Sequence, residues 1–166
     1  MGILFASTVN ASNSDDWSTI SSIGTDSLVV AALGLPVLEG DIGGFSDAGL
    51  SILGASAMAG VGKYLIDAER PDQSDDNSFP SNHTANAFAA ATNLHLRYGW
   101  TVGLPAYGVA TLVGIGRAQA NKHHWSDVVA GATVGTLSGW YFTTEHFQLL
   151  PWASRNGLGF NISTSW

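Results

Sequence analysis

The pattern of apolar and polar positions divides the chain into a polar beginning, a long apolar middle and a mixed end. Residues 1–25 are rich in serine, asparagine and aspartate, which favours a flexible N-terminal tail. Apolar and small residues then recur at helical spacing and predict helices at about 26–38, 46–69, 84–98, 101–116 and 126–143. Weak alternation over 157–166 indicates that one short strand could form. The pattern predicts an all-α bundle of about five helices at 26–150, with a C-terminal tail at 151–166.

Two of the predicted helices have unusual surfaces. Segments 98–116 and 128–144 contain no Asp, Glu, Lys or Arg, and they approach the roughly 20 residues that a bilayer span needs. Gly131, Gly135 and Gly139 lie four residues apart on one helix face, a spacing that lets helix backbones approach closely. We therefore expect membrane association. Tight packing inside a soluble bundle remains the alternative interpretation.

The overall composition narrows the classes of function. Charged residues make up 11% of the chain and hydrophobic residues 45%, and the net charge is −7. An acidic chain is a poor match for nucleic acid, whose phosphates are bound by basic patches. The chain has no cysteine, which excludes disulfides and thiolate zinc sites and is compatible with an oxidising compartment.

The few basic residues are concentrated in three polar clusters. The clusters are KYLIDAERP at 63–71, FPSNHT at 79–84 and GRAQANKHHWSD at 116–127. Four of the 6 Lys and Arg residues in the chain lie in these clusters, namely Lys63, Arg70 and Arg117 together with Lys122. Scattered surface charge is a poor explanation for that placement, so the clusters are candidate functional segments.

The predicted helices bring the three clusters to one end of the bundle. Lys63 and Arg70 are seven residues apart, so they are expected to share one helix face, and Pro71 is expected to end that helix. Ser81 or Asn82 is positioned to cap the next helix. That helix and its successor have similar predicted lengths, about 21 and 24 Å at 1.5 Å per residue, and a turn at 98–100 joins them.

The same geometry defines a candidate anion site. His83 and Arg117 are expected at the same end of the helical hairpin, and His123 and Asp127 open the last helix nearby. Three cations and a helix N-terminus favour a bound anion. Asp127, four residues after His123, can hold one imidazole N–H and leave the other nitrogen as a nucleophile. His83 is suited to protonating a leaving oxygen. The surrounding cations oppose a metal at the histidines, so no metal or other cofactor is expected.

The spacing within these clusters resembles that of the type 2 phosphatidic acid phosphatase (PAP2) superfamily. The family motifs are K-x6-R-P, P-S-G-H and S-R-x5-H-x3-D. Lys63, Arg70 and Pro71 match the first motif, Pro80, Ser81 and His83 the second, and Arg117, His123 and Asp127 the third. The similarity covers about residues 26–143 and is shared with bacterial acid phosphatases and vanadate haloperoxidases.

The resemblance implies a role for each matched residue. Lys63, Arg70 and Arg117 would bind the phosphate oxygens, with help from Ser81 and the amides near Asn82. His123 would form a phosphohistidine, His83 would protonate the leaving group, and Asp127 would orient His123. Two positions depart from the pattern, because Asn82 replaces a glycine and Gly116 replaces a serine. Asparagine tolerates a left-handed backbone, but both changes could alter rate or substrate choice.

These observations together predict a metal-independent phosphatase. Its substrate would be a phosphomonoester or pyrophosphate, and low charge with apolar helices favours a lipid carrier. We expect a cell-envelope location, periplasmic or membrane-associated, with the site facing the exoplasmic side. The alternatives are a soluble nonspecific acid phosphatase, a vanadate-dependent haloperoxidase and a non-catalytic phosphate-binding membrane module. The sequence does not define the oligomeric state.

Overall fold

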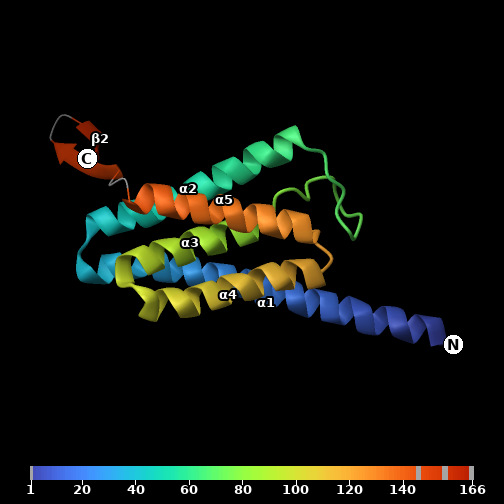
Figure 1. Cartoon of the computed structure of the whole chain (residues 1–166). Coiled ribbons are helices and arrows are strands. Elements are labelled where there is room, and N and C mark those ends of the chain that lie inside the picture. Colours follow the sequence, from blue (N-terminus) through green and yellow to red (C-terminus); the bar gives the residue numbers. More distant parts are fainter. Residues whose placement is uncertain (1, 145–146, 155–156, 165–166) are drawn as a thin grey trace.

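The structure, a computed structural model, describes residues 2–144, 147–154 and 157–164, which form five α-helices and one two-stranded sheet (Figure 1). The helices are α1 (Gly2–Glu39), α2 (Ile42–Leu65), α3 (Asn82–Tyr98), α4 (Trp100–Gln119) and α5 (Trp125–Thr144). The predicted helical bundle is confirmed. Strands β1 (Phe147–Ser154) and β2 (Gly157–Thr164) follow and pair in antiparallel fashion. The sequence predicts a strand only where β2 lies.

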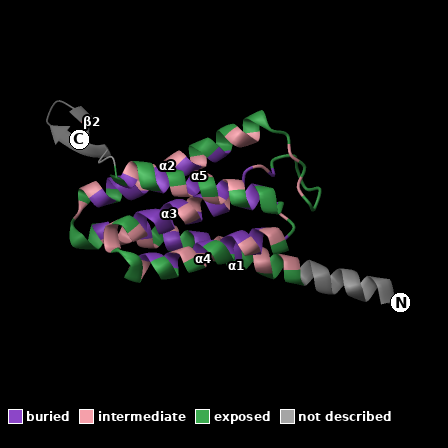
Figure 2. Cartoon of the chain, viewed as in Figure 1, coloured by how far each residue is buried: buried purple, intermediate pink, exposed green. Residues whose placement is uncertain are grey.

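Helix α3 occupies the centre of the bundle and contacts the other four helices. Figure 2 shows it as mostly buried. Its buried apolar side chains are alanines apart from one leucine: Ala85, Ala87, Ala89, Ala90, Ala91 and Leu94. Such small side chains let the surrounding helices approach closely. The core is therefore thin and depends on close helix contact rather than on large apolar side chains.

Helix α5 packs on α3 through the three glycines that the sequence singles out. A Cβ added at Gly131 would lie 2.5 Å from the carbonyl oxygen of Ser81, and one at Gly139 would lie 2.8 Å from that of Ala89. One at Gly135 would collide with the carbonyl oxygen of Ala85. The predicted close approach of backbones is confirmed, and it places the first turn of α5 beside the first turn of α3.

The turn between α3 and α4 sets which ends of these helices meet. Gly99 ends α3 with a φ of 74°, a backbone conformation that glycine adopts without steric cost. Its N–H donates to the carbonyl of His95 at 2.8 Å, and α4 begins at Trp100. The two helices therefore run antiparallel. The start of α3 and the end of α4 lie at the same end of the bundle, as the sequence predicts.

The prediction of a flexible tail at residues 1–25 is wrong. Helix α1 spans Gly2–Glu39 without a break. Ser21, Thr25 and Leu28 lie inside this helix and are buried. Serine, asparagine and aspartate have modest helix propensity, and that is why the composition favours a tail. Packing against neighbouring helices supplies the stability that propensity lacks. The helix predicted at 26–38 is thus the end of a much longer one.

Two other boundaries also differ from the prediction. Helix α2 ends at Leu65 rather than near residue 69, because the backbone at Ile66 is extended. The N–H of Ala68 then donates to Asp76 and that of Arg70 to Asp75, so the chain folds into a loop. Arg70 therefore does not share a helix face with Lys63. At the other end, the predicted C-terminal tail at 151–166 contains the second half of β1 and all of β2.

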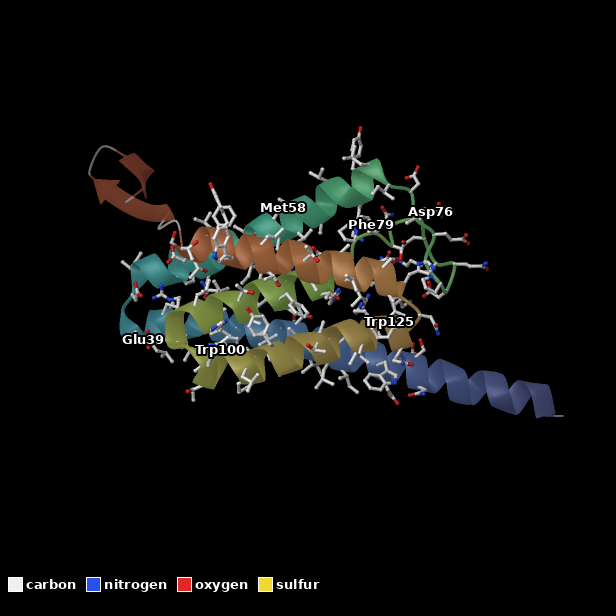
Figure 3. The ribbon with its side chains drawn as sticks, in the orientation of Figure 1. Glu39, Met58, Asp76, Phe79, Trp100 and Trp125 are labelled. Carbon is white, nitrogen blue, oxygen red and sulfur yellow. The ribbon has the colours of Figure 1, made fainter. Side chains whose placement is uncertain are left out.

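The outer faces of the bundle carry many large apolar side chains. Val30, Leu53, Leu104, Val129 and Leu137 are each more than half exposed. Trp100, Trp125 and Trp140 are exposed as well, and Figure 3 shows Trp100 and Trp125 near opposite ends of the bundle. Among the described residues, one helix, Asn13–Glu39, is long and apolar enough by length and composition to cross a membrane. An apolar lateral surface of this extent is unusual for a domain bathed in water.

Candidate functional site

The three polar clusters meet at the end of the bundle that carries the loop between α2 and α3 (Figure 3). Lys63 lies in the last turn of α2, His83 in the first turn of α3, Arg117 in the last turn of α4 and Asp127 in the first turn of α5. His123 lies in the connection between α4 and α5. The charges of Lys63, Arg70 and Arg117 all act on both His83 and His123. The structure therefore brings together the residues that the sequence singles out.

The loop after α2 holds Lys63 and Arg70 on a shared partner. The Lys63 ammonium and Nη2 of Arg70 both donate to the carbonyl oxygen of Asn77. Nη1 of Arg70 donates to the carbonyl oxygen of Lys122 at 3.2 Å, and Nε pairs with Asp75 at 2.6 Å. Arg70 thus reaches the site from a loop and links the first cluster to the third.

The ring of His123 is buried and has a defined proton arrangement. Its Nδ1 lies 2.7 Å from the carbonyl oxygen of Ser78, and the residue is 3% exposed. A carbonyl oxygen only accepts hydrogen bonds, so Nδ1 carries the proton and the neutral ring keeps its lone pair on Nε2. Burial and then the charge of Arg117 lower the pKa of His123 to about 3. The ring is therefore neutral at physiological pH.

Asp127 does not contact His123 in the way that the sequence suggests. Its Oδ2 is 3.9 Å from Nδ1 of His123, beyond hydrogen-bond distance. The same oxygen accepts from the Ser78 hydroxyl at 2.5 Å and from the backbone N–H of His124 at 2.8 Å. Burial alone would raise the pKa of Asp127, but these hydrogen bonds lower it overall. Asp127 therefore holds both the loop at Ser78 and the backbone at His124, which lie on either side of the His123 ring.

Ser78 is the site residue that sequence reasoning missed. It is completely buried, and it binds Asp127 through its hydroxyl and His123 through its carbonyl oxygen. Its N–H donates to the carbonyl of Ala68 at 2.9 Å. The only signal in the sequence is its position two residues before Pro80. A serine in a polar loop gives no indication of such contacts.

His83 lies in the first turn of α3 and is partly buried. Burial, followed by the charge of Arg117, lowers the pKa of His83 to about 4, and Asp26 on α1 opposes this shift. A bound anion would also oppose it by offsetting the positive charges. The protonation state of His83 therefore depends on whether the site holds negative charge.

The second cluster forms the start of α3. Ser81 precedes the helix, and its hydroxyl pairs with that of Thr84 at 2.9 Å rather than capping a backbone N–H. Its own N–H donates to the carbonyl of Asp127 at 3.0 Å. Asn82 begins the helix and the N–H of Ala85 makes the first hydrogen bond to the carbonyl of Ser81, so the N–H groups of residues 82–84 lack partners within the helix. Free N–H groups at a helix start favour an anion.

Arg117 is the most buried cation of the group. It is 6% exposed, and its Nε has no hydrogen-bond partner among the described residues. Burial and the nearby charge of Arg70 lower the pKa of Arg117 from its ordinary value. A buried guanidinium with an unpaired N–H is costly unless an anion compensates it. This residue gives the strongest physical indication that the site binds an anion.

Comparison with known proteins shows which family and which relatives the chain resembles. The PAP2 superfamily model matches residues 45–150. The chain is 46% identical over 99 residues to a lipid A 1-phosphatase of Porphyromonas gingivalis, an alignment that covers 57% of this chain and 22% of that protein. It is 30% identical over 109 residues to a lipid A 4'-phosphatase of Helicobacter pylori, covering 57% of this chain and 53% of that one. The chain thus matches about half or less of each relative's length.

Solved structures share the fold. LpxE from Aquifex aeolicus superposes with a TM-score of 0.67 and 22% identity, covering 78% of this chain and 84% of that one. A transmembrane PAP2-type phosphatidylglycerolphosphate phosphatase from Bacillus subtilis gives a TM-score of 0.62 and 21% identity, with coverage of 82% and 84%. At this level of identity the likeness concerns the helical arrangement alone.

Proposed function

The chain belongs to the PAP2 superfamily, and from that membership we propose that it is a phosphatase that hydrolyses a lipid phosphate through a phosphohistidine intermediate. The observation that carries the proposal is the set of three cations around a neutral, oriented His123. Mere phosphate binding would need the cations alone. An oriented nucleophile and a second histidine are groups that a reaction needs.

His123 would act as the nucleophile. With Nδ1 donating to Ser78, the lone pair on Nε2 is free to attack phosphorus. A P–N bond then forms as the bond between phosphorus and the leaving oxygen breaks. The lowered pKa of His123 favours this role, because a protonated ring has no lone pair to offer.

His83 would move the proton. As the phosphorus–oxygen bond breaks, His83 gives its proton to the leaving alkoxide or phosphate. Its pKa of about 4 belongs to the empty site. A bound phosphate dianion would offset the charges of Arg117 and Arg70 and raise that pKa, so substrate itself would promote protonation of His83. In the second half-reaction His83 accepts a proton from water, the water attacks phosphorus and the P–N bond breaks.

Lys63, Arg70 and Arg117 would hold the phosphate oxygens. Phosphoryl transfer depends mainly on positioning and on stabilisation of negative charge. Arginine can bind two phosphate oxygens with one guanidinium, whereas lysine supplies a point charge. The N–H groups of residues 82–84, at the start of α3, and the dipole of that helix add to the same field. These groups supply the charge compensation that a metal ion would otherwise give.

The lateral surface supports a membrane location and a lipid substrate. Between residues 48 and 62 of α2, 100 and 116 of α4, and 128 and 144 of α5 there is no Asp, Glu, Lys or Arg. Trp125 lies at the site end and Trp100 at the other end, as expected for side chains at two membrane interfaces. We propose that the bundle is embedded in the cell envelope, with the site at the exoplasmic surface.

A substrate panel with the purified protein in detergent tests this proposal. Phosphate release is measured from lipid A bearing a 1- or 4'-phosphate, phosphatidate, phosphatidylglycerol phosphate, a polyprenyl pyrophosphate and a water-soluble aryl phosphate. We expect a lipid to be preferred, vanadate to inhibit competitively and a chelator to have no effect. Preference for the soluble ester would instead favour a nonspecific acid phosphatase. Bromide oxidation with added vanadate would favour a haloperoxidase.

A further inference from the structure

Helix α1 lies outside the segment that the family model matches, yet it packs against the site end of α4. The hydroxyl of Ser14 donates to the carbonyl oxygen of Ala120 at 2.8 Å. Further along the same helix, a Cβ added at Gly24 would lie 2.8 Å from Cγ2 of Val113. Several turns of α1 therefore run alongside the last turns of α4.

The two helices also pack closely at Gly116. A Cβ added there would lie 3.0 Å from Cβ of Ser21 and 3.2 Å from the carbonyl oxygen of Trp17. A Cβ at this position would require the facing part of α1 to shift by a few tenths of an ångström, and one of these neighbours is backbone. The glycine that departs from the family motif is thus the position that admits α1.

The approach brings a hydroxyl group to the adjacent arginine. Nη1 of Arg117 donates to Oγ of Ser18 at 3.5 Å, across 99 residues of sequence. Among the described residues, this is the hydrogen bond that the Arg117 side chain makes, and its Nε has no partner. The guanidinium is buried, and its orientation matters because it presents a planar set of donors.

We propose that Ser18 of α1 is a positioning residue for Arg117 in the phosphate site. The absence of a side chain at Gly116 lets α1 pack close enough for this contact. This inference rests on the proposed phosphatase function. A hydroxyl holds one N–H of the guanidinium and contributes no negative charge. The full charge of Arg117 and its remaining N–H groups therefore stay available to the phosphate. A carboxylate in the same place would compete with the substrate.

Binding of orthovanadate to the purified, detergent-solubilised full chain tests the proposal without relying on turnover. Vanadate stands in for the transferred phosphoryl group, and its dissociation constant is measured by vanadium NMR. We expect Ser18→Ala to raise the dissociation constant about five- to tenfold, the loss of one hydrogen bond to a charged group. Ser18→Thr, which keeps a hydroxyl, should stay within about twofold of wild type on the same reasoning.

Ser14→Ala is the matched control, since it removes a hydrogen bond between the same helix and the segment after α4 without touching Arg117. We expect it to leave vanadate affinity unchanged. An equal loss in Ser14→Ala would assign the effect to docking of α1 as a whole and overturn the proposal. Unchanged affinity in Ser18→Ala would overturn it as well.

A double-mutant cycle with Gly116→Ala and Ser18→Ala tests the role of Gly116. Gly116→Ala should shift the facing turn of α1 by a few tenths of an ångström. It should therefore lengthen the contact between Ser18 and Arg117 and weaken vanadate binding, and Ser18→Ala should then add little in that background. Fully additive effects would contradict the coupling. The outcomes also separate the two levels of inference. Wild type that binds no vanadate and releases no phosphate would refute the proposed function, whereas an active wild type with an unaffected Ser18→Ala would refute only the positioning role.

Discussion

The carbonyl oxygen of Ser78 lies 2.7 Å from Nδ1 of His123. The hydroxyl of the same serine donates to Asp127 at 2.5 Å, so one loop residue connects the carboxylate to the imidazole. The expected direct contact between Asp127 and His123 is replaced by a contact through Ser78. This arrangement makes the loop between α2 and α3 part of the machinery that orients the proposed nucleophile.

Ser78→Ala should lower kcat more than it changes KM. The substitution keeps the carbonyl oxygen that holds His123 but removes the hydroxyl donated to Asp127, so the loop and the ring lose a common anchor. We expect a loss in kcat of about tenfold, the scale of one charge-assisted hydrogen bond. Steady-state kinetics on the preferred substrate measure it. Ser74→Ala, an exposed position in the same loop, is the control, and an equal loss in both variants would argue against a specific role for Ser78.

Acidification should destabilise the ligand-free protein between pH 7 and pH 5. The pKa values of His83 and His123 are about 4 and about 3 in the folded chain, below the value of about 6.5 for free imidazole. As the pH falls through 6.5, the unfolded chain binds protons that the folded chain does not, so the free energy of unfolding decreases. The slope is at most about 1.4 kcal/mol per pH unit for each histidine.

Thermal unfolding in detergent at several pH values measures this dependence. The carboxylates whose pKa values are lowered, such as Asp72 at about 2, do not titrate in this range and do not obscure it. His83→Gln should reduce the slope, because one of the two groups is removed. A melting temperature that is constant or rises on acidification would contradict the neutral state of both rings in the folded protein.

Gly135→Ala and Gly108→Ala should have opposite effects on stability. A Cβ at Gly135 meets the backbone of α3, whereas one at Gly108, on the exposed face of α4, meets nothing within 4 Å. We expect the first change to destabilise by about 1–3 kcal/mol through overpacking. The second should stabilise by about 0.5–1 kcal/mol, because alanine favours a helix over glycine. Equal melting temperatures for the two variants would refute the close packing of α5 on α3.

The sequence predicts the helix topology that brings the site residues together. It predicts few of the hydrogen bonds between those residues. The turn at Gly99 and the glycines of α5 carry strong local signals, so the topology and the convergence of the clusters followed from spacing alone. The contacts of Ser78 and Ser18 carry none, since each is an ordinary serine whose partner comes from a distant part of the chain. The sequence places Arg70 in a helix, whereas α2 ends at Leu65. No glycine or proline at Ile66 indicates that the backbone becomes extended there.

Phosphate transfer to His123 is the central claim, and a trapping experiment with its neighbour as control tests it most directly. The purified protein is mixed with phosphate-labelled lipid, quenched in alkali within the first turnover and digested for mass spectrometry. The account predicts a phosphohistidine at His123, no label and no phosphate release in His123→Ala, and nearly normal turnover in His124→Ala, whose side chain is largely exposed. Turnover by His123→Ala within tenfold of wild type, or label on another residue, would contradict it.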